Sequence, residues 1–140
     1  MTELADTSAW VWSRKPARGE LRHEFDTALV DGKIATCDMV RLELLYSARN
    51  TEDFTQLRED LEALADCPVG PAEWKRALWV YERLAAQGAM HQRAVKHPDL
   101  LIAAAAEAAG AAVLHYDQDY DRIAAITGQP TIWIAPRGTL

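Results

Sequence analysis

Residues 97–134 read HPDLLIAAAAEAAGAAVLHYDQDYDRIAAITGQPTIWI, and they hold the clearest pattern of secondary structure in the chain. The run His97-Pro98-Asp99 begins an alanine-rich helix that we expect to continue to residue 109 and to stop at Gly110. A buried strand is predicted at residues 112–115, a helix at 119–127 and a last strand at 131–134. Helices that alternate with short apolar strands are typical of a parallel sheet covered by helices.

The same alternation continues toward the N-terminus. A short strand around residues 3–5 leads into Asp6-Thr7-Ser8, which has the chemistry of a helix N-cap. The further elements that we predict are helices at 21–30, 38–48, 51–64 and 71–87, a strand at 33–36 and an edge strand at 67–69. In the helix that begins at Pro71, the expected buried stripe is Trp74, Ala77, Leu78, Tyr81, Leu84 and Ala85. The predicted fold class is therefore α/β, with a parallel sheet and helices on both faces.

Length and composition indicate an ordinary globular domain. The chain has 140 residues, 49% of them hydrophobic and 26% charged, without repeats or linkers, so we expect one domain over residues 1–140. Two cysteines are too few for a disulfide framework, and no leader or membrane span is evident, which predicts a soluble cytoplasmic protein. The net charge of −6 argues against a general nucleic-acid coat, although residues 73–97 carry five bases and only two acids.

Five acidic residues fall where a parallel sheet would bind a ligand, outside the carboxyl ends of its strands. Asp6 follows the first strand, and Asp117 and Asp119 follow the strand at 112–115. Asp99 is in the first turn of its helix, and Glu43 lies mid-helix beside an apolar stripe, where a carboxylate needs a partner.

Each of these residues also has a purely structural interpretation. An aspartate after a strand is commonly an N-cap or turn residue. Glu43 could reach solvent or pair with Arg41 or with a nearby helix, and His115 could simply be packed at its strand end. Taken together, however, the acids would repel one another at one sheet edge unless a cation were present. Oxygen-only ligands suit Mg²⁺ or Mn²⁺, and such ions promote phosphodiester hydrolysis. This hypothesis assumes that the acids converge in space.

Four motifs in order resemble a known family. They are Asp6-Thr7-Ser8, Glu43 within Arg-Leu-Glu-Leu-Leu, Asp99 within Pro-Asp-Leu-Leu-Ile-Ala-Ala, and Asp117-Gln118-Asp119-Tyr120. Over residues 4–134 the chain resembles the PIN-domain ribonucleases, and in particular the VapC toxins of bacterial VapBC toxin–antitoxin pairs. The resemblance implies a three-layer α/β/α fold with a parallel five-stranded sheet.

The resemblance also implies roles for individual residues. Asp6, Glu43, Asp99 and Asp117 would be the catalytic acids, and Asp119 would support or share the metal site with Asp6, Asp99 and Asp117. Ser8 resembles the family's hydroxyl that hydrogen-bonds the acidic cluster, although it could equally cap the helix. His115 stands where many relatives have Thr or Ser, and a hydrogen bond from it to a metal-bound water is one interpretation.

The function that the resemblance implies is a Mg²⁺- or Mn²⁺-dependent endoribonuclease. It would cleave tRNA or an exposed ribosomal RNA loop with a metal-activated water and arrest growth. A VapB-type antitoxin would neutralise it, and it would form a homodimer. The basic residues that could contact RNA phosphates are Arg14, Lys15, Arg18, Arg93 and Lys96, each of which could instead be a solvated surface charge.

Two alternatives remain open at this point. A phospho-accepting receiver domain also gathers acids at the edge of a doubly wound sheet, but it needs an acid pair after its first strand and a lysine after its last. Here Thr7 and Ser8 follow Asp6, and Ala135-Pro136 follows the last strand. A catalytically silent PIN scaffold would be favoured by the loss of a principal acid, and all four are present.

Overall fold

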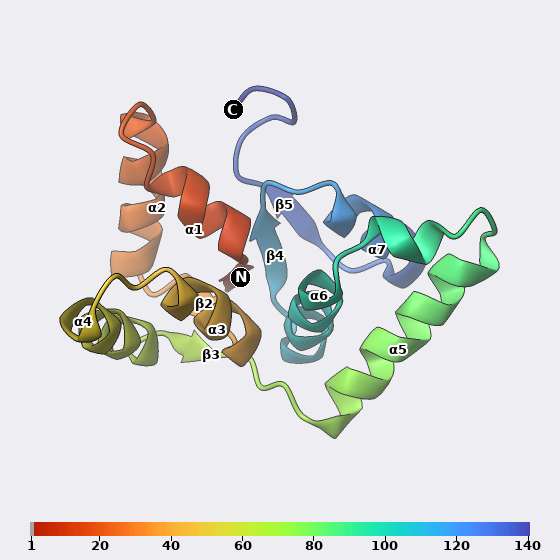
Figure 1. The fold of residues 1–140 in the computed structure, drawn as a ribbon. Coiled ribbons are helices and arrows are strands. Elements are labelled where there is room, and N and C mark those ends of the chain that lie inside the picture. Colours follow the sequence, from red (N-terminus) through yellow and green to blue (C-terminus); the bar gives the residue numbers. More distant parts are fainter. Residues whose placement is uncertain (1) are drawn as a thin grey trace.

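Five parallel strands form the centre of the molecule in the computed structural model, which describes residues 2–140 (Figure 1). They are β1 (Glu3–Ala5), β2 (Ile34–Thr36), β3 (Ala65–Asp66), β4 (Ala112–His115) and β5 (Thr131–Trp133). Their order in the sheet is β3-β2-β1-β4-β5, so the chain builds outward from β1 in one direction and then continues on its other side with β4. A receiver domain has the order 2-1-3-4-5. The receiver alternative is therefore wrong.

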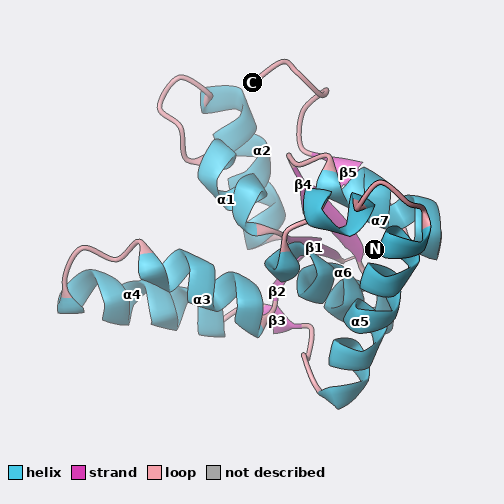
Figure 2. Cartoon of the chain, turned by 45° about the vertical axis from the view of Figure 1, so that its right-hand side comes forward, coloured by secondary structure: helices cyan, strands magenta, loops and turns pink. Residues whose placement is uncertain are grey.

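Helices join these strands and confirm the α/β class. Their bounds are α1 (Thr7–Ser13), α2 (Gly19–Val30), α3 (Asp38–Tyr46), α4 (Thr51–Glu62), α5 (Pro71–Ala86), the short 3-10 helix η1 (His91–Ala94), α6 (His97–Ala109) and α7 (Asp119–Thr127). In Figure 2, α3 and α4 lie side by side and project from the edge of the sheet formed by β2 and β3. No helix within residues 2–140 is both long and apolar enough to cross a membrane.

The strands separate two hydrophobic cores because successive side chains point to opposite faces of a sheet. Leu4, Ala35 and Val113 are in register on one face and pack in the core that α5, α6 and α7 complete. Their neighbours along the strands pack on the other face with the first two helices; they are Ala5, Ile34 and Leu114, joined by Ala9 and Phe25. The sheet thus lies between two helical layers, which confirms the predicted three-layer fold.

Several predicted helices and strands begin or end one or two residues away from their observed bounds, and two differences are larger. The edge strand β3 ends at Asp66 rather than extending over 67–69: the Cys67 amide still donates to the Thr36 carbonyl, but Pro68 has no N–H to continue the ladder. In α5 the buried residues are Ala77, Val80 and Leu84, whereas Trp74 and Leu78 are 55% and 64% exposed. The apolar arc of α5 is wider than the stripe that α6 covers, so the sequence pattern could not show which side of that arc is buried.

Helix α6 brings an acidic side chain into the interior. Every residue from Asp99 to Ala106 is buried, because small alanine side chains let the helix pack closely on the sheet and on α5. Pro98 lies in the first turn, where proline is favoured, and Gly110 ends the helix with a φ of 70°. Asp99 is therefore held at the buried N-terminal end of a well-defined helix.

Candidate metal centre at the sheet edge

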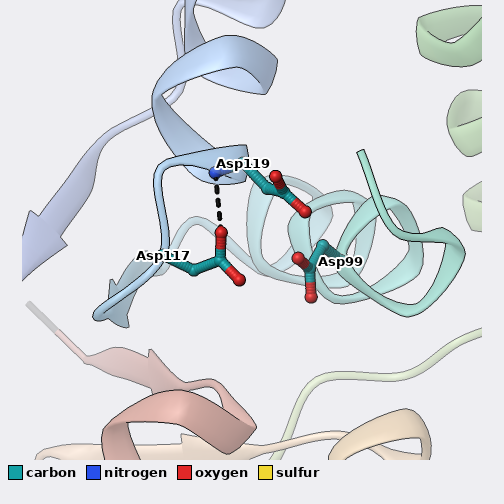
Figure 3. Close-up of side chains that lie close together, drawn as sticks. All are labelled: Asp99, Asp117 and Asp119. Atoms are coloured by element: carbon teal, nitrogen blue, oxygen red, sulfur yellow. Dashed lines mark hydrogen bonds between the residues drawn. The ribbon is translucent and has the colours of Figure 1, made fainter. Parts of the chain in front are cut away.

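Three aspartates converge beside the carboxyl end of β4 (Figure 3). Asp99 comes from the first turn of α6, Asp117 from the loop after β4, and Asp119 from the first residue of α7. One carboxylate oxygen from each lies within 4.8 Å of the others. The edge lies where β1 and β4 are neighbours, the point at which the strand order reverses and where ligands bind in open α/β sheets.

The loop between β4 and α7 is held by three hydrogen bonds. The Asp119 amide donates to Asp117 Oδ1 at 2.9 Å, and the Asp117 amide donates to His115 Nδ1 at 3.1 Å. The Tyr116 amide donates to the Ser8 hydroxyl at 2.8 Å. These bonds fix the Asp-Gln-Asp turn against both its own strand and the start of α1.

Asp6 lies directly beyond β1 and caps α1. Its Oδ1 accepts the Ala9 amide at 2.9 Å and the Ser8 hydroxyl at 2.6 Å, so Ser8 contacts the acid as the resemblance implied. Burial raises the pKa of Asp6 to about 6, although these bonds and the Tyr120 hydroxyl act to lower it. The Tyr120 hydroxyl donates to Asp99 Oδ1 at 3.1 Å, so the residue that lowers the pKa of Asp6 also contacts one of the three converging aspartates.

Glu43 pairs with a residue of a nearby helix, one of the options that the sequence left open. The Thr7 hydroxyl donates to Glu43 Oε1 at 2.7 Å, which ties α3 to the residue after Asp6. Arg41, the partner considered from the sequence, instead pairs with Asp38 and Asp66. Glu43 is therefore next to the Asp6 end of the site and is not one of the three converging carboxylates.

Asp99 is the most strongly perturbed acid of the group. Its burial, the neighbouring Asp119 and the negative charges of Asp117 and Asp6 raise its pKa to about 8, against the lowering effect of Lys96. Its Oδ2 atom is buried and has no hydrogen bond within residues 2–140. A buried carboxylate oxygen without a hydrogen bond, in an all-oxygen cluster, fits the ligand preference of Mg²⁺ or Mn²⁺.

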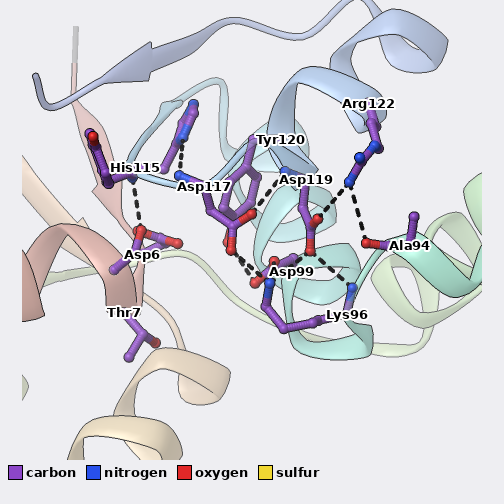
Figure 4. A network of polar contacts seen from close by, with 12 residues as sticks. Asp6, Thr7, Ala94, Lys96, Asp99, His115, Asp117, Asp119, Tyr120 and Arg122 are labelled. Carbon is purple, nitrogen blue, oxygen red and sulfur yellow. Dashed lines mark hydrogen bonds and ion pairs between the residues drawn. The ribbon is translucent and has the colours of Figure 1, made fainter. Parts of the chain in front are cut away.

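Basic groups also approach the cluster, as Figure 4 shows. The Lys96 ammonium lies 2.7 Å from Asp117 Oδ2, 2.9 Å from Asp119 Oδ2 and 3.4 Å from Asp99 Oδ2. Arg122 reaches Asp119 Oδ1 at 3.3 Å. Burial opposes ionisation of Asp119, but the neighbouring Asp99 and the hydrogen bonds from Lys96 lower its pKa overall.

The five residues expected to contact RNA fall into two groups. Arg14 pairs with Asp26 at 2.6 Å, Lys15 lies over the Trp12 ring and Arg18 precedes α2, so these three share the α1–α2 region. Arg93 and Lys96 instead line one hollow of about 490 Å³ beside the first turn of α6. The two groups thus lie in different parts of the molecule. In the second group, the Lys96 ammonium contacts the acidic cluster.

His115 is a buried residue of β4. Its ring lies 4.8 Å from the Tyr120 ring and 4.9 Å from the Trp133 ring, centroid to centroid. Burial lowers the pKa of His115 to about 4, so the imidazole is neutral at pH 7 and its Nδ1 can accept the Asp117 amide. With Nδ1 used in this way, the histidine acts on the site through the backbone of Asp117.

Sequence reasoning missed three contacts in this site: Thr7 on Glu43, Tyr120 on Asp99, and Arg122 on Asp119. A signal existed for one of them. Arg122 is three residues after Asp119 on one helix, the same spacing that separates Lys96 from Asp99. The contact between Thr7 and Glu43 joins residues 36 apart and has no local signature.

Comparison with known proteins identifies the family. The PIN domain family model matches residues 4–126. Ribonuclease VapC18 of Mycobacterium tuberculosis is 50% identical over 140 residues, the whole of both chains, and Ribonuclease VapC51 of that species is 42% identical over 98% of this chain and 96% of its own. The structure of DNA-bound VapBC from Salmonella typhimurium has the same fold, with a TM-score of 0.70 at 18% identity over 96% of this chain and 100% of that one. The chain therefore belongs to the PIN domain family and, within it, to the VapC group.

Proposed function

We propose that this chain is the toxin of a type II toxin–antitoxin pair and an endoribonuclease that depends on Mg²⁺ or Mn²⁺. The observation that carries the proposal is the convergence of Asp99, Asp117 and Asp119 at the sheet edge beside the buried Asp6. Relatives that match the full length of the chain are named ribonucleases, which supports RNA as the substrate. Its target would be tRNA or an exposed ribosomal RNA loop.

The donor set suits a hard divalent cation. Asp99, Asp117 and Asp119 would hold the ion, and Asp6 would join them, linked through the Tyr120 hydroxyl. Oδ2 of Asp99 is buried and makes no hydrogen bond among the described residues, with the Lys96 ammonium 3.4 Å away, and this is the strongest sign that a ligand belongs here. A divalent ion bound to these oxygens would lower the pKa of water and offset the charge that builds up on a phosphodiester.

The chain's own residues would orient the acids and move protons. Ser8 and the Ala9 amide hold Oδ1 of Asp6, and Tyr120 holds Oδ1 of Asp99, which fixes the direction of both carboxyl groups. Thr7 holds Oε1 of Glu43, so we assign Oε2 of Glu43 the task of accepting a proton from the attacking water. His115 and Ser8 would keep the loop that carries Asp117 in its working conformation.

The proposed partners follow from the charge distribution and the relatives. Arg14, Lys15 and Arg18 would contact RNA phosphates away from the cut, and Arg93 would do so beside the acids. The structural neighbours include VapBC complexes, which supports a VapB-type antitoxin as the neutralising partner. We also propose a homodimer that works in the cytoplasm.

The test is cleavage of total host RNA by the purified protein, freed of antitoxin, with the ends mapped by sequencing. We expect discrete cuts with Mg²⁺ or Mn²⁺, none with EDTA and none with Asp6→Asn, because asparagine keeps the N-cap of α1 but removes a ligand charge. Cuts that persist in EDTA, or a folded protein that makes no cuts, would contradict the proposal.

A further inference from the structure

Lys96 occupies the centre of the acidic cluster. Its ammonium is within 3.4 Å of one oxygen from each of Asp99, Asp117 and Asp119. These are the three residues whose oxygens converge to within 4.8 Å. A lysine ammonium has three N–H donors, one for each of these three carboxyl groups, and its positive charge offsets part of their negative charge.

The backbone of Lys96 is anchored while its side chain is not enclosed. The Lys96 amide donates to Asp119 Oδ2 at 3.0 Å, and Arg122 donates to the Ala94 carbonyl, so the segment before α6 is tied to α7. The Lys96 side chain is nonetheless 61% exposed. Its long flexible stem can therefore leave the cluster without moving the main chain.

One ammonium and one divalent ion cannot share this place. The three residues that would bind a cation are the three that Lys96 contacts, through Oδ2 of Asp99, Asp117 and Asp119. Two cations a few ångströms apart also repel each other strongly. Binding of a divalent ion at these oxygens therefore requires the ammonium to withdraw.

We propose that Lys96 is a tethered counter-ion of the metal site: it offsets part of the negative charge of the aspartates when no metal is bound, and a divalent ion must displace it to bind. The inference rests on the metal site of the proposed function. Lys96 thereby sets how much free metal the protein needs, because the binding free energy of the ion is reduced by the contacts that the lysine gives up. The main role of Lys96 is thus to control the affinity for the metal rather than to contact RNA phosphates.

The test is isothermal titration of the metal-free protein with MnCl₂ at pH 8. We expect Lys96→Met to bind Mn²⁺ more tightly than the wild type, by on the order of tenfold, because close charge pairs contribute at least about this much to binding. Lys96→Arg keeps a competing cation and should stay near the wild-type affinity. Lys75→Met removes the same charge from an exposed position of α5 and serves as the matched control, with unchanged affinity.

The outcomes separate this inference from the function on which it rests. If the wild type binds Mn²⁺, Asp99→Asn abolishes binding and Lys96→Met binds no more tightly than Lys75→Met, the counter-ion role is wrong and the metal site stands. If neither the wild type nor Lys96→Met binds Mn²⁺ at millimolar concentration, the metal site and the counter-ion role are both wrong.

Thermal unfolding provides a second readout that needs no RNA cleavage. Without metal, Lys96→Met should melt at a lower temperature than the wild type, because three close carboxylates lose their neutralising charge. Saturating Mn²⁺ should raise its melting temperature more than that of the wild type. Equal melting temperatures of the two metal-free proteins would overturn the inference.

Discussion

The two most acidic regions of this molecule behave in opposite ways. Residues 49–66, which include α4, carry six acids against two arginines, yet most of these side chains are on the surface, where Arg49 pairs with Asp53 at 3.0 Å. The site at the sheet edge gathers fewer acids from both ends of the chain and buries Asp6, Asp99 and Asp119. A dense acidic sequence thus makes a solvated helix face, whereas a few acids that the topology brings together make a candidate ligand site.

Burial explains the difference in chemistry. Asp6 and Asp99 are 2% and 5% exposed, and desolvation raises the pKa of both, to about 6 and about 8. Asp60 in α4 is exposed and accepts a hydrogen bond from Gln56 one helical turn away. Only the buried aspartates lose free energy when they ionise without a partner, and a bound cation would offset that loss.

The largest effect on RNA cleavage is expected when one aspartate of the buried site is neutralised, and the same change in α4 serves as its control. Asp99→Asn should reduce RNA cleavage by about a hundredfold or more, because it removes a metal ligand while an oxygen can still accept from Tyr120. The matched variant Asp60→Asn in α4 should leave cleavage within about twofold, as surface substitutions usually do. Initial rates on a defined RNA measure both, and equal losses in the two variants would erase the distinction between the regions.

The next effect is the pH dependence of stability in the metal-free protein. The pKa values of Asp6 and Asp99 are higher folded than unfolded, so their contribution is complete below about pH 4 and is lost as pH rises through 6 and then 8. Between pH 5 and pH 8.5, the wild type should lose on the order of 4 kcal/mol relative to Asp99→Asn.

Urea unfolding at each pH measures this difference. Asp60→Asn is the control and should follow the wild-type curve. Millimolar Mn²⁺ should reduce the loss, because the ion stabilises the ionised carboxylates. Parallel curves for the wild type and Asp99→Asn without metal would show that Asp99 is not perturbed by burial.

A smaller effect is expected where Glu43 meets α1. Thr7→Val removes the hydroxyl that holds Glu43 Oε1 at 2.7 Å while keeping the shape of the side chain. Cleavage should fall by about tenfold, the usual effect of removing a group that orients an active-site residue. Thr27→Val removes a comparable hydroxyl, bonded to the His23 carbonyl in α2, and should leave the rate unchanged. A Thr7→Val enzyme as fast as Thr27→Val would remove Glu43 from the reaction.

The smallest expected effect concerns the link between the two loops of the site. Ser8→Ala removes the donor to Asp6 and leaves the Tyr116 amide without its acceptor. The free energy of unfolding should fall by about 1 kcal/mol. Ser47→Ala, which loses a bond to the Leu44 carbonyl at the exposed end of α3, is the control and should lose less. Chemical denaturation compares them, and a Ser8→Ala protein as stable as the wild type would mean that this link contributes little.

Much of the fold could be predicted from residues 97–134 and from the upstream alternation of strands and helices. The bounds of α6 and α7 were predicted to the residue, because Pro98, Gly110 and the Asp-rich first turn of α7 mark them. The buried side of α5 was not predicted, since Trp74 and Leu78 look as apolar in sequence as Val80. The residues of α5 that become buried are those that α6 packs against, and tertiary packing of this kind is not visible in the local sequence pattern.

The acids of the site were predictable, but their neighbours were not. Asp6, Asp99, Asp117 and Asp119 could be chosen because each follows a strand or starts a helix at one edge of a parallel sheet. Lys96 was expected to face RNA, and the structure directs it into the aspartate cluster. No periodicity reveals that residues 96 and 117 meet, because the loop between β4 and α7 creates their contact.

The most direct test of the metal centre is an anomalous difference map from crystals soaked in millimolar Mn²⁺. We predict a peak bounded by Asp99, Asp117 and Asp119, with the Lys96 ammonium no longer in contact with all three carboxylates. A fully occupied Mn²⁺ elsewhere, for example on the acids of α4, with the aspartate cluster empty, would contradict this account.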